Sequence, residues 1–249
     1  MTRRALAAGW CLITLLAATS GAFAGCLPAK LVVAIDAGHG PKAPGATSAS
    51  GVAEYHFNLR LAGQVRDALY AAGFTKAFLI DPTGLDLPPA GRAKRANAAG
   101  TALLISIHHD SAQPQFFTSE TVGGTTRRFC DHFAGYSLFY SGRNRHADDS
   151  LAFARLIGRQ LRREGLPFTR HHAADVPGER RPLVDDELGV YRYDGLAVLH
   201  AAASPAVLVE AGVIVNRTEE AELAGPTRQM QTARAITRAV VNWCAGQRP

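Results

Sequence analysis

The segment Leu31–Gly40, with the sequence LVVAIDAGHG, decides the fold of this chain. It opens with a continuous apolar run rich in β-branched residues, a pattern that predicts a strand buried on both faces. The run ends in DAGHG at residues 36–40, where two glycines allow a sharp turn at the carboxyl end of the strand. Open α/β sheets bind their ligands at that edge. His39, which lies on this turn, is therefore suited to bind a metal or transfer a proton.

Two later apolar runs also end in polar residues. Residues 102–107 run into His108 and His109, and residues 205–209 run into Glu210. Neighbouring residues of a strand face opposite ways, so only one of the two histidines shares the side of the opening histidine. Position alone leaves both open. Because parallel strands end at the same edge of a sheet, we expect these side chains to converge there.

A helix is expected over residues 51–72, and Glu54 is the odd member of its inward face. The rest of that face is apolar or small, apart from an asparagine, and keeps a spacing of three and four residues. A glutamate in the first turn suits the helix dipole on any face, but this one points at the sheet. A buried carboxylate needs a partner or a metal.

Two histidines, one carboxylate and an open fourth position form a common catalytic zinc set. A second carboxylate that is not a ligand can serve as the general base. With His39, Glu54, Glu210 and one histidine of the pair 108–109, this chain offers both parts.

The remaining patterns complete an α/β fold. Further strands are expected at 76–81 and 136–140, and helices near 148–164 and 227–244, with Asp148, Asp149 and Ser150 as N-cap candidates for the first. Residues 216–219 have the sequence of a capping box. We predict a single three-layer domain with a mostly parallel central sheet of about six strands and helices on both faces.

In two segments the apolar residues show no regular spacing. Residues 111–134 are polar and aromatic with a turn expected at Gly123-Gly124, and residues 166–195 carry His171, His172 and many charges. A long irregular segment in a compact domain is usually functional, so residues 166–195 are expected to form one wall of a cleft.

The N-terminus has the pattern of an export signal. Arg3 and Arg4 precede a short apolar run, and Ala22-Phe23-Ala24 fits a cleavage site. We expect residues 1–24 to be a signal peptide, residues 25–249 to be the catalytic domain, and the chain to be periplasmic without a transmembrane helix. Lipid attachment at Cys26 is the alternative, since the preceding residues partly fit a lipobox.

Composition fits one globular domain, with 47% hydrophobic and 19% charged residues among 249. Without residues 1–24 the net charge falls from +6 to +4. The arginines are spread along the chain without interleaved aromatic residues, which argues against nucleic-acid binding.

The cysteines that remain after cleavage are Cys26, Cys130 and Cys244. A helix that follows a strand runs back along it, so the first strand begins and the last helix ends at the same end of the domain. An oxidising compartment would let Cys26 and Cys244 join.

Taken in order, the motifs resemble those of the zinc-dependent N-acetylmuramoyl-L-alanine amidases of type 3, bacterial cell-wall hydrolases. The matching elements are Asp36 to Gly40, Glu54 with Asn58-Leu59 behind it, Arg92 to Asn97, Ser106-Ile107-His108, and Pro205 to Glu210 with Gly212. The departures are His109-Asp110, where the family often has Ala-Asn, and Val213, where it often has Phe.

The resemblance implies one Zn²⁺ held by His39, Glu54 and His108, with Glu210 as the catalytic proton acceptor. The implied reaction hydrolyses the amide between N-acetylmuramic acid and L-alanine of peptidoglycan. A monomer is expected, and the need for an activator stays open. The alternatives are a zinc peptidase or deacylase acting on another cell-wall amide, and an inactive wall-binding regulator.

Overall fold

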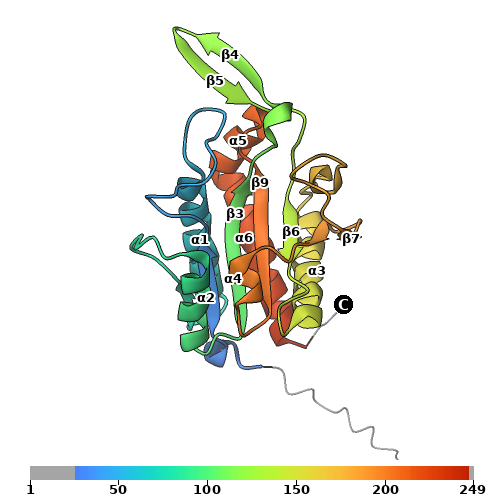
Figure 1. Cartoon of the computed structure of the whole chain (residues 1–249). Coiled ribbons are helices and arrows are strands. Elements are labelled where there is room, and N and C mark those ends of the chain that lie inside the picture. The colour runs from blue at the N-terminus through green and yellow to red at the C-terminus, as the bar shows by residue number, and fades with distance from the viewer. Residues whose placement is uncertain (1–25, 247–249) are drawn as a thin grey trace, which may run out of the picture.

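The central sheet lies in the middle of the molecule in this computed structural model, which describes residues 26–246 (Figure 1). The expected signal peptide lies outside the described residues. Within them, seven strands form the sheet in the order β2-β1-β3-β9-β6-β8-β7. The strands are β1 (Val33–Ala37), β2 (Ala77–Leu79), β3 (Leu103–Asp110), β6 (Ser137–Tyr140), β7 (Leu183–Asp185), β8 (Val190–Arg192) and β9 (Ala206–Val213).

Strands β2, β1, β3 and β9 are parallel, and β6 is antiparallel to β9. Strand β8 is parallel to β6, and β7 is antiparallel to β8. The predicted fold class is confirmed, with a few differences. The sheet has seven strands where about six were expected, and β7 and β8 lie in residues 166–195, which lack a sequence period. Those strands have three residues each, too few to show a period of two.

Helices cover both faces of the sheet. The larger core joins alternate residues of β1, β3 and β9 to α1, α3, α5 and α6, and the smaller core joins the opposite face to α2 and α4. The helices are α1 (Glu54–Ala71), α2 (Pro89–Ala98), α3 (Ala147–Arg163), α4 (Ala197–His200), α5 (Arg217–Ala224) and α6 (Pro226–Cys244). Within the described range, no helix is long and apolar enough to cross a membrane.

Of the two predictions of helix N-caps, one is confirmed and one is wrong. Asn216 caps α5 and accepts hydrogen bonds from the backbone N–H groups of Thr218 and Glu219, as the sequence predicts. The expected N-cap for α3 is wrong: Asp148, Asp149 and Ser150 lie inside the helix, and its N-cap is His146. The Ser150 hydroxyl instead donates to the His146 carbonyl at 2.8 Å.

Residues 118–129 form an antiparallel hairpin of β4 (Thr118–Val122) and β5 (Thr125–Phe129), and Gly123-Gly124 is its turn, as expected. Figure 1 shows the hairpin projecting from the end of the molecule at which β3 ends. It follows β3 through a short 3₁₀ helix, Pro114–Phe116.

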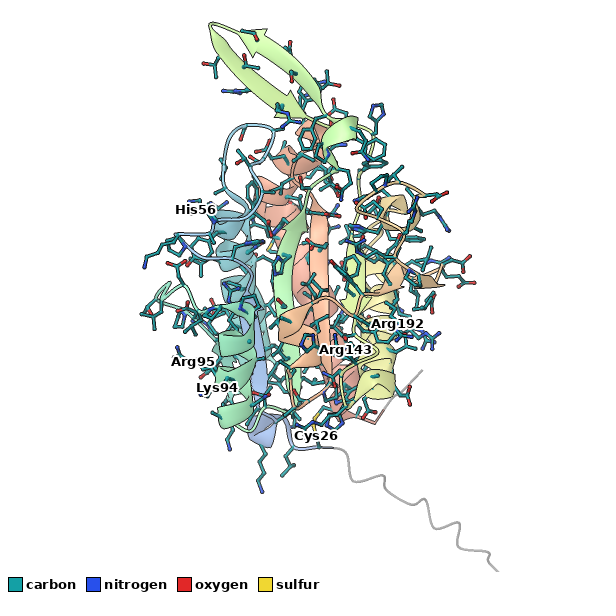
Figure 2. All side chains as sticks on the ribbon, viewed as in Figure 1. Cys26, His56, Lys94, Arg95, Arg143 and Arg192 are labelled. Atoms are coloured by element: carbon teal, nitrogen blue, oxygen red, sulfur yellow. A yellow bond between two sulfur atoms is a disulfide. The ribbon has the colours of Figure 1, made fainter. Side chains whose placement is uncertain are left out.

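Cys26 and Cys244 form a disulfide, with their Cα atoms 5.0 Å apart. The expected bridge is thus present, and it leaves Cys26 without a thiol for lipid attachment. Figure 2 shows Cys26 at the end of the molecule opposite the β4–β5 hairpin. The third cysteine of the described residues, Cys130, is buried and unpaired.

The disulfide is expected to stabilise the domain without affecting its chemistry. It closes a loop with a sequence separation of 218, and removing a native disulfide from a small secreted domain typically costs about 2–5 kcal/mol. Urea unfolding of the Cys26→Ser/Cys244→Ser variant should therefore give a lower free energy of unfolding, with turnover per folded molecule retained. An unchanged unfolding midpoint in the variant would contradict this expectation.

Candidate active site

The turn after β1 is held in place by Arg92 of α2. The guanidinium donates to the carbonyl of Ala37 at 3.1 Å and to the carbonyl of His39, and it lies 3.4 Å from the Asp36 carboxylate. Ser106 of β3 donates to the same carboxylate at 2.7 Å. These contacts secure His39 at a φ of 67°, a left-handed conformation that is uncommon for a residue other than glycine. Arg92 and Asp36 thus position the turn, roles that their sequence motifs alone did not reveal.

Glu54 lies between two histidines at the carboxyl edge of the sheet. Its Oε2 is 3.1 Å from Nε2 of His39, and its Oε1 is 3.0 Å from Nδ1 of His108. The three donor atoms that could hold a metal lie within 4.8 Å of one another. The predicted convergence of a β1 turn, a helix start and the end of β3 is therefore present.

Further hydrogen bonds hold Glu54 in place. Its carboxylate accepts from Asn58 Nδ2 at 2.9 Å, from the backbone N–H of Ala46 at 3.1 Å and from that of His109 at 3.3 Å. Burial raises the pKa of Glu54, but the hydrogen bonds and charges of His108 and His39 outweigh burial and hold that pKa well below its usual range. Glu54 is ionised at neutral pH.

The contact with Glu54 also changes the pKa of His39. Its hydrogen bond to Glu54 raises the pKa of His39, and this outweighs the opposing effect of partial burial. An imidazole beside an ionised carboxylate therefore attracts a positive charge, whether a proton or a metal ion.

His108 and His109 face opposite sides of β3, as strand alternation predicts. The Nδ1 of His109 lies 2.7 Å from Oδ1 of Asn58, and burial lowers the pKa of His109 to about 3. Asn58 also donates to the Gly38 carbonyl at 3.0 Å. Asn58 thus connects Glu54, the turn after β1 and β3. The sequence alone does not predict this positioning role.

Glu210 lies beside His108, its pairing partner across β3 and β9. Its Oε2 is buried and has no hydrogen-bond partner among residues 26–246. Burial, with the negative charges of Asp110 and Glu54, raises the pKa of Glu210 well above its ordinary value. A carboxyl group with a raised pKa binds a proton more readily than an ordinary one.

Glu210 also lines a cavity of about 210 Å³. The other lining residues include His172, Glu179 and Arg181 from the segment 166–195. The prediction that this segment forms one wall of a cleft is confirmed.

Two glycines leave room for the donor atoms. A Cβ atom on Gly38 would lie 2.2 Å from Nε2 of His108, and one on Gly45 would lie 2.4 Å from Oε2 of Glu54. Both distances are shorter than any real contact of this kind, so a side chain at either position would displace a donor. The need for glycine after β1 therefore comes from close approach to His108.

The family model for N-acetylmuramoyl-L-alanine amidases, Amidase_3, matches residues 33–242. The chain belongs to this family. It is similar to the N-acetylmuramoyl-L-alanine amidase AmiC of Neisseria meningitidis serogroup B, with 26% identity over 84% of this chain and 51% of the relative. It is also similar to the amidase Rv3717 of Mycobacterium tuberculosis, with 27% identity over 83% of this chain and 75% of the relative. The chain thus spans about half the length of the AmiC relative.

Solved amidase structures share the fold. The catalytic domain of CwlV from Bacillus (Paenibacillus) polymyxa var. colistinus aligns with a TM-score of 0.64 and 26% identity, covering 86% of this chain and 97% of the other. The amidase Ami1 of Mycobacterium smegmatis aligns with a TM-score of 0.69 and 22% identity, covering 88% and 98%. The Amidase_3 fold therefore extends over nearly all of the described residues.

Replacing Gly38 tests the packing around His108. In Gly38→Ala the new methyl group would collide with the His108 ring, so the metal affinity of the candidate triad should fall at least about tenfold, a loss of about 1.4 kcal/mol. Gly63→Ala is the matched control, because a Cβ on Gly63 of α1 meets nothing within 4 Å. Zinc titration followed by metal analysis measures both, and equal affinities in the two variants would contradict the packing argument.

Proposed function

We propose that this chain is a zinc-dependent N-acetylmuramoyl-L-alanine amidase. In this proposal His39, Glu54 and His108 hold the metal, and Glu210 is the catalytic residue that moves the proton. The substrate is peptidoglycan, and the bond that is cleaved joins N-acetylmuramic acid to L-alanine of the stem peptide. The observation that carries the proposal is the convergence of this donor set in a chain of the Amidase_3 family.

The donor set is suitable for zinc. Two imidazole nitrogens and one carboxylate oxygen are typical ligands of catalytic zinc, which keeps a further position open. Asn58, which donates to Glu54, supplies the kind of outer contact that orients such ligands. A zinc ion bound here supplies Lewis-acid polarisation and lowers the pKa of water.

Glu210 supplies the proton transfer. Its buried Oε2 is free of hydrogen bonds from the described residues, so it can accept a proton from the attacking water. The same group, once protonated, can donate to the amine of L-alanine as the amide bond breaks. The raised pKa of Glu210 makes its carboxylate a stronger proton acceptor than an ordinary carboxylate.

Export to the periplasm is part of the proposal. Disulfides persist in oxidising compartments, and the described chain carries the Cys26–Cys244 bridge. The signal-peptide pattern of residues 1–24 agrees with that compartment. A bridged Cys26 favours the soluble periplasmic form over a lipoprotein.

Digestion of purified peptidoglycan tests the reaction. The expected product is a stem peptide with a new N-terminal L-alanine, released only when zinc is present. Cleavage within the stem peptide would instead identify a peptidase, and sedimentation with the wall without cleavage would identify a wall-binding protein. Either result would overturn the proposed activity.

The role of Glu210 is tested by Glu210→Gln, which keeps the size of the side chain but cannot accept the proton. Turnover should fall about a hundredfold or more, while zinc content stays unchanged. Glu187→Gln is the control, since the Glu187 side chain is 79% exposed. Near-normal turnover in Glu210→Gln would show that another group, such as His172 or Glu179, carries the proton.

A further inference from the structure

A second cluster of metal-binding side chains lies two residues further along β3. Asp110 contacts two histidines of the 3₁₀ turn His171–Ala173. Its Oδ2 lies 2.8 Å from Nε2 of His172 and 3.3 Å from Nε2 of His171. The donor atoms of these three residues lie within 4.8 Å of one another.

The donors and spacings match those around Glu54. Both clusters consist of two imidazole nitrogens and one carboxylate, and the carboxylate–imidazole distances around Glu54 are 3.0 and 3.1 Å. Zinc–ligand bonds of 2.0–2.1 Å in a tetrahedron place neighbouring donors about 3.3 Å apart. Only small shifts would therefore be needed for an ion to bind among Asp110, His171 and His172.

The Nε2 of each ring faces Asp110, and the Nδ1 of each ring has a partner on its far side. The Nδ1 of His172 lies 3.0 Å from the Glu179 carboxylate, so this nitrogen carries the hydrogen. The Nδ1 of His171 lies 2.8 Å from the Thr169 hydroxyl. A histidine that donates from one ring nitrogen to a carboxylate presents the other as a metal ligand.

His171 gives the independent observation. Its side chain is 1% exposed, and its Nε2 faces the Asp110 carboxylate at 3.3 Å without a well-aligned hydrogen bond. The ring is held firmly, because Phe133 stacks on it at 4.6 Å between centroids and the His172 ring lies at 4.0 Å. A buried polar atom without a well-aligned hydrogen bond is costly, and a cation between Nε2 and Asp110 would satisfy both groups.

The cluster is reachable from solvent. Asp110, His172 and Glu179 line the same 210 Å³ cavity as Glu210. That cavity gives an entry path and leaves space for a water molecule to complete the coordination.

We propose that Asp110, His171 and His172 form a second binding site for a divalent transition metal, separate from the site at His39, Glu54 and His108. Glu179 orients His172 from behind, and it acts as a positioning residue of this site. The two ions share Glu210 as a common neighbour, so the domain holds two metals at one edge of its sheet. This site does not depend on the amidase activity.

Zinc stoichiometry tests the second site. The protein is stripped with a chelator, dialysed against buffered Zn²⁺ and analysed for metal by mass spectrometry. The intact chain should hold two zinc ions, and His171→Gln and His39→Ala should each hold one. Saturation of the intact chain at a single zinc would overturn the proposal, because a proton on His172 would then suffice for Asp110.

Variants separate the two sites from each other. In His39→Ala the remaining ion belongs to the second site, so Co²⁺ added to this variant should give visible absorption that His39→Ala/Asp110→Asn lacks. Asp110→Asn keeps the shape of the side chain and replaces His171→Gln if that variant does not fold. His56→Gln is the control, since His56 lies exposed at the edge of the molecule on α1 and should keep both ions (Figure 2).

Glu179→Gln tests the positioning role. Loss of such a supporting carboxylate typically weakens metal affinity about 10–100-fold, and only the second zinc should be affected. Equal loss of both ions, or no Co²⁺ absorption in the His39→Ala chain, would contradict a separate second site. Absence of amidase activity in the intact chain with both ions bound would instead count against the proposed function alone.

Discussion

The buried carboxylate of Glu54 is the interaction on which the rest of the site depends. Removing an ionised carboxylate from water costs several kcal/mol unless partners replace the water. Here the partners come from distant parts of the chain: the turn after β1, the end of β3 and the loop before α1. Each partner is useful only if its own backbone is fixed. Arg92 fixes the turn after β1 by binding its carbonyl groups. Strand pairing fixes the end of β3.

Much of this arrangement could be predicted because strand ends are strongly encoded. The apolar run before His39 and the run before Glu210 identify buried strands, and parallel pairing then brings their ends together. Glu54 was found as a carboxylate on a face that should be apolar. Strand alternation showed that His108 and His109 must separate, but the choice between them came from the family resemblance. The structure gives the physical reason, because Asn58 holds His109 on the opposite face.

The features that the sequence did not predict are those that depend on contacts between residues far apart in the chain. Strand β8 exists because it pairs with β6, and β7 exists because it pairs with β8; no period within three residues could reveal either. The start of α3 was misplaced because Asp148 and Ser150 are good capping residues that the helix does not use. His171 and His172 lie in an irregular segment, and only the fold brings them to Asp110, the last residue of β3, which precedes His172 by 62 residues in the chain.

Glu210 connects these features through electrostatics. Burial, together with the negative charges of Asp110 and Glu54, raises the pKa of Glu210. A cation bound to either carboxylate opposes that charge and favours the ionised form of Glu210. By linkage, ionising Glu210 must then strengthen cation binding by the same amount. In the proposed function, a cation held by Glu54 would therefore lower the pKa of Glu210 and favour the ionised form that accepts a proton from water.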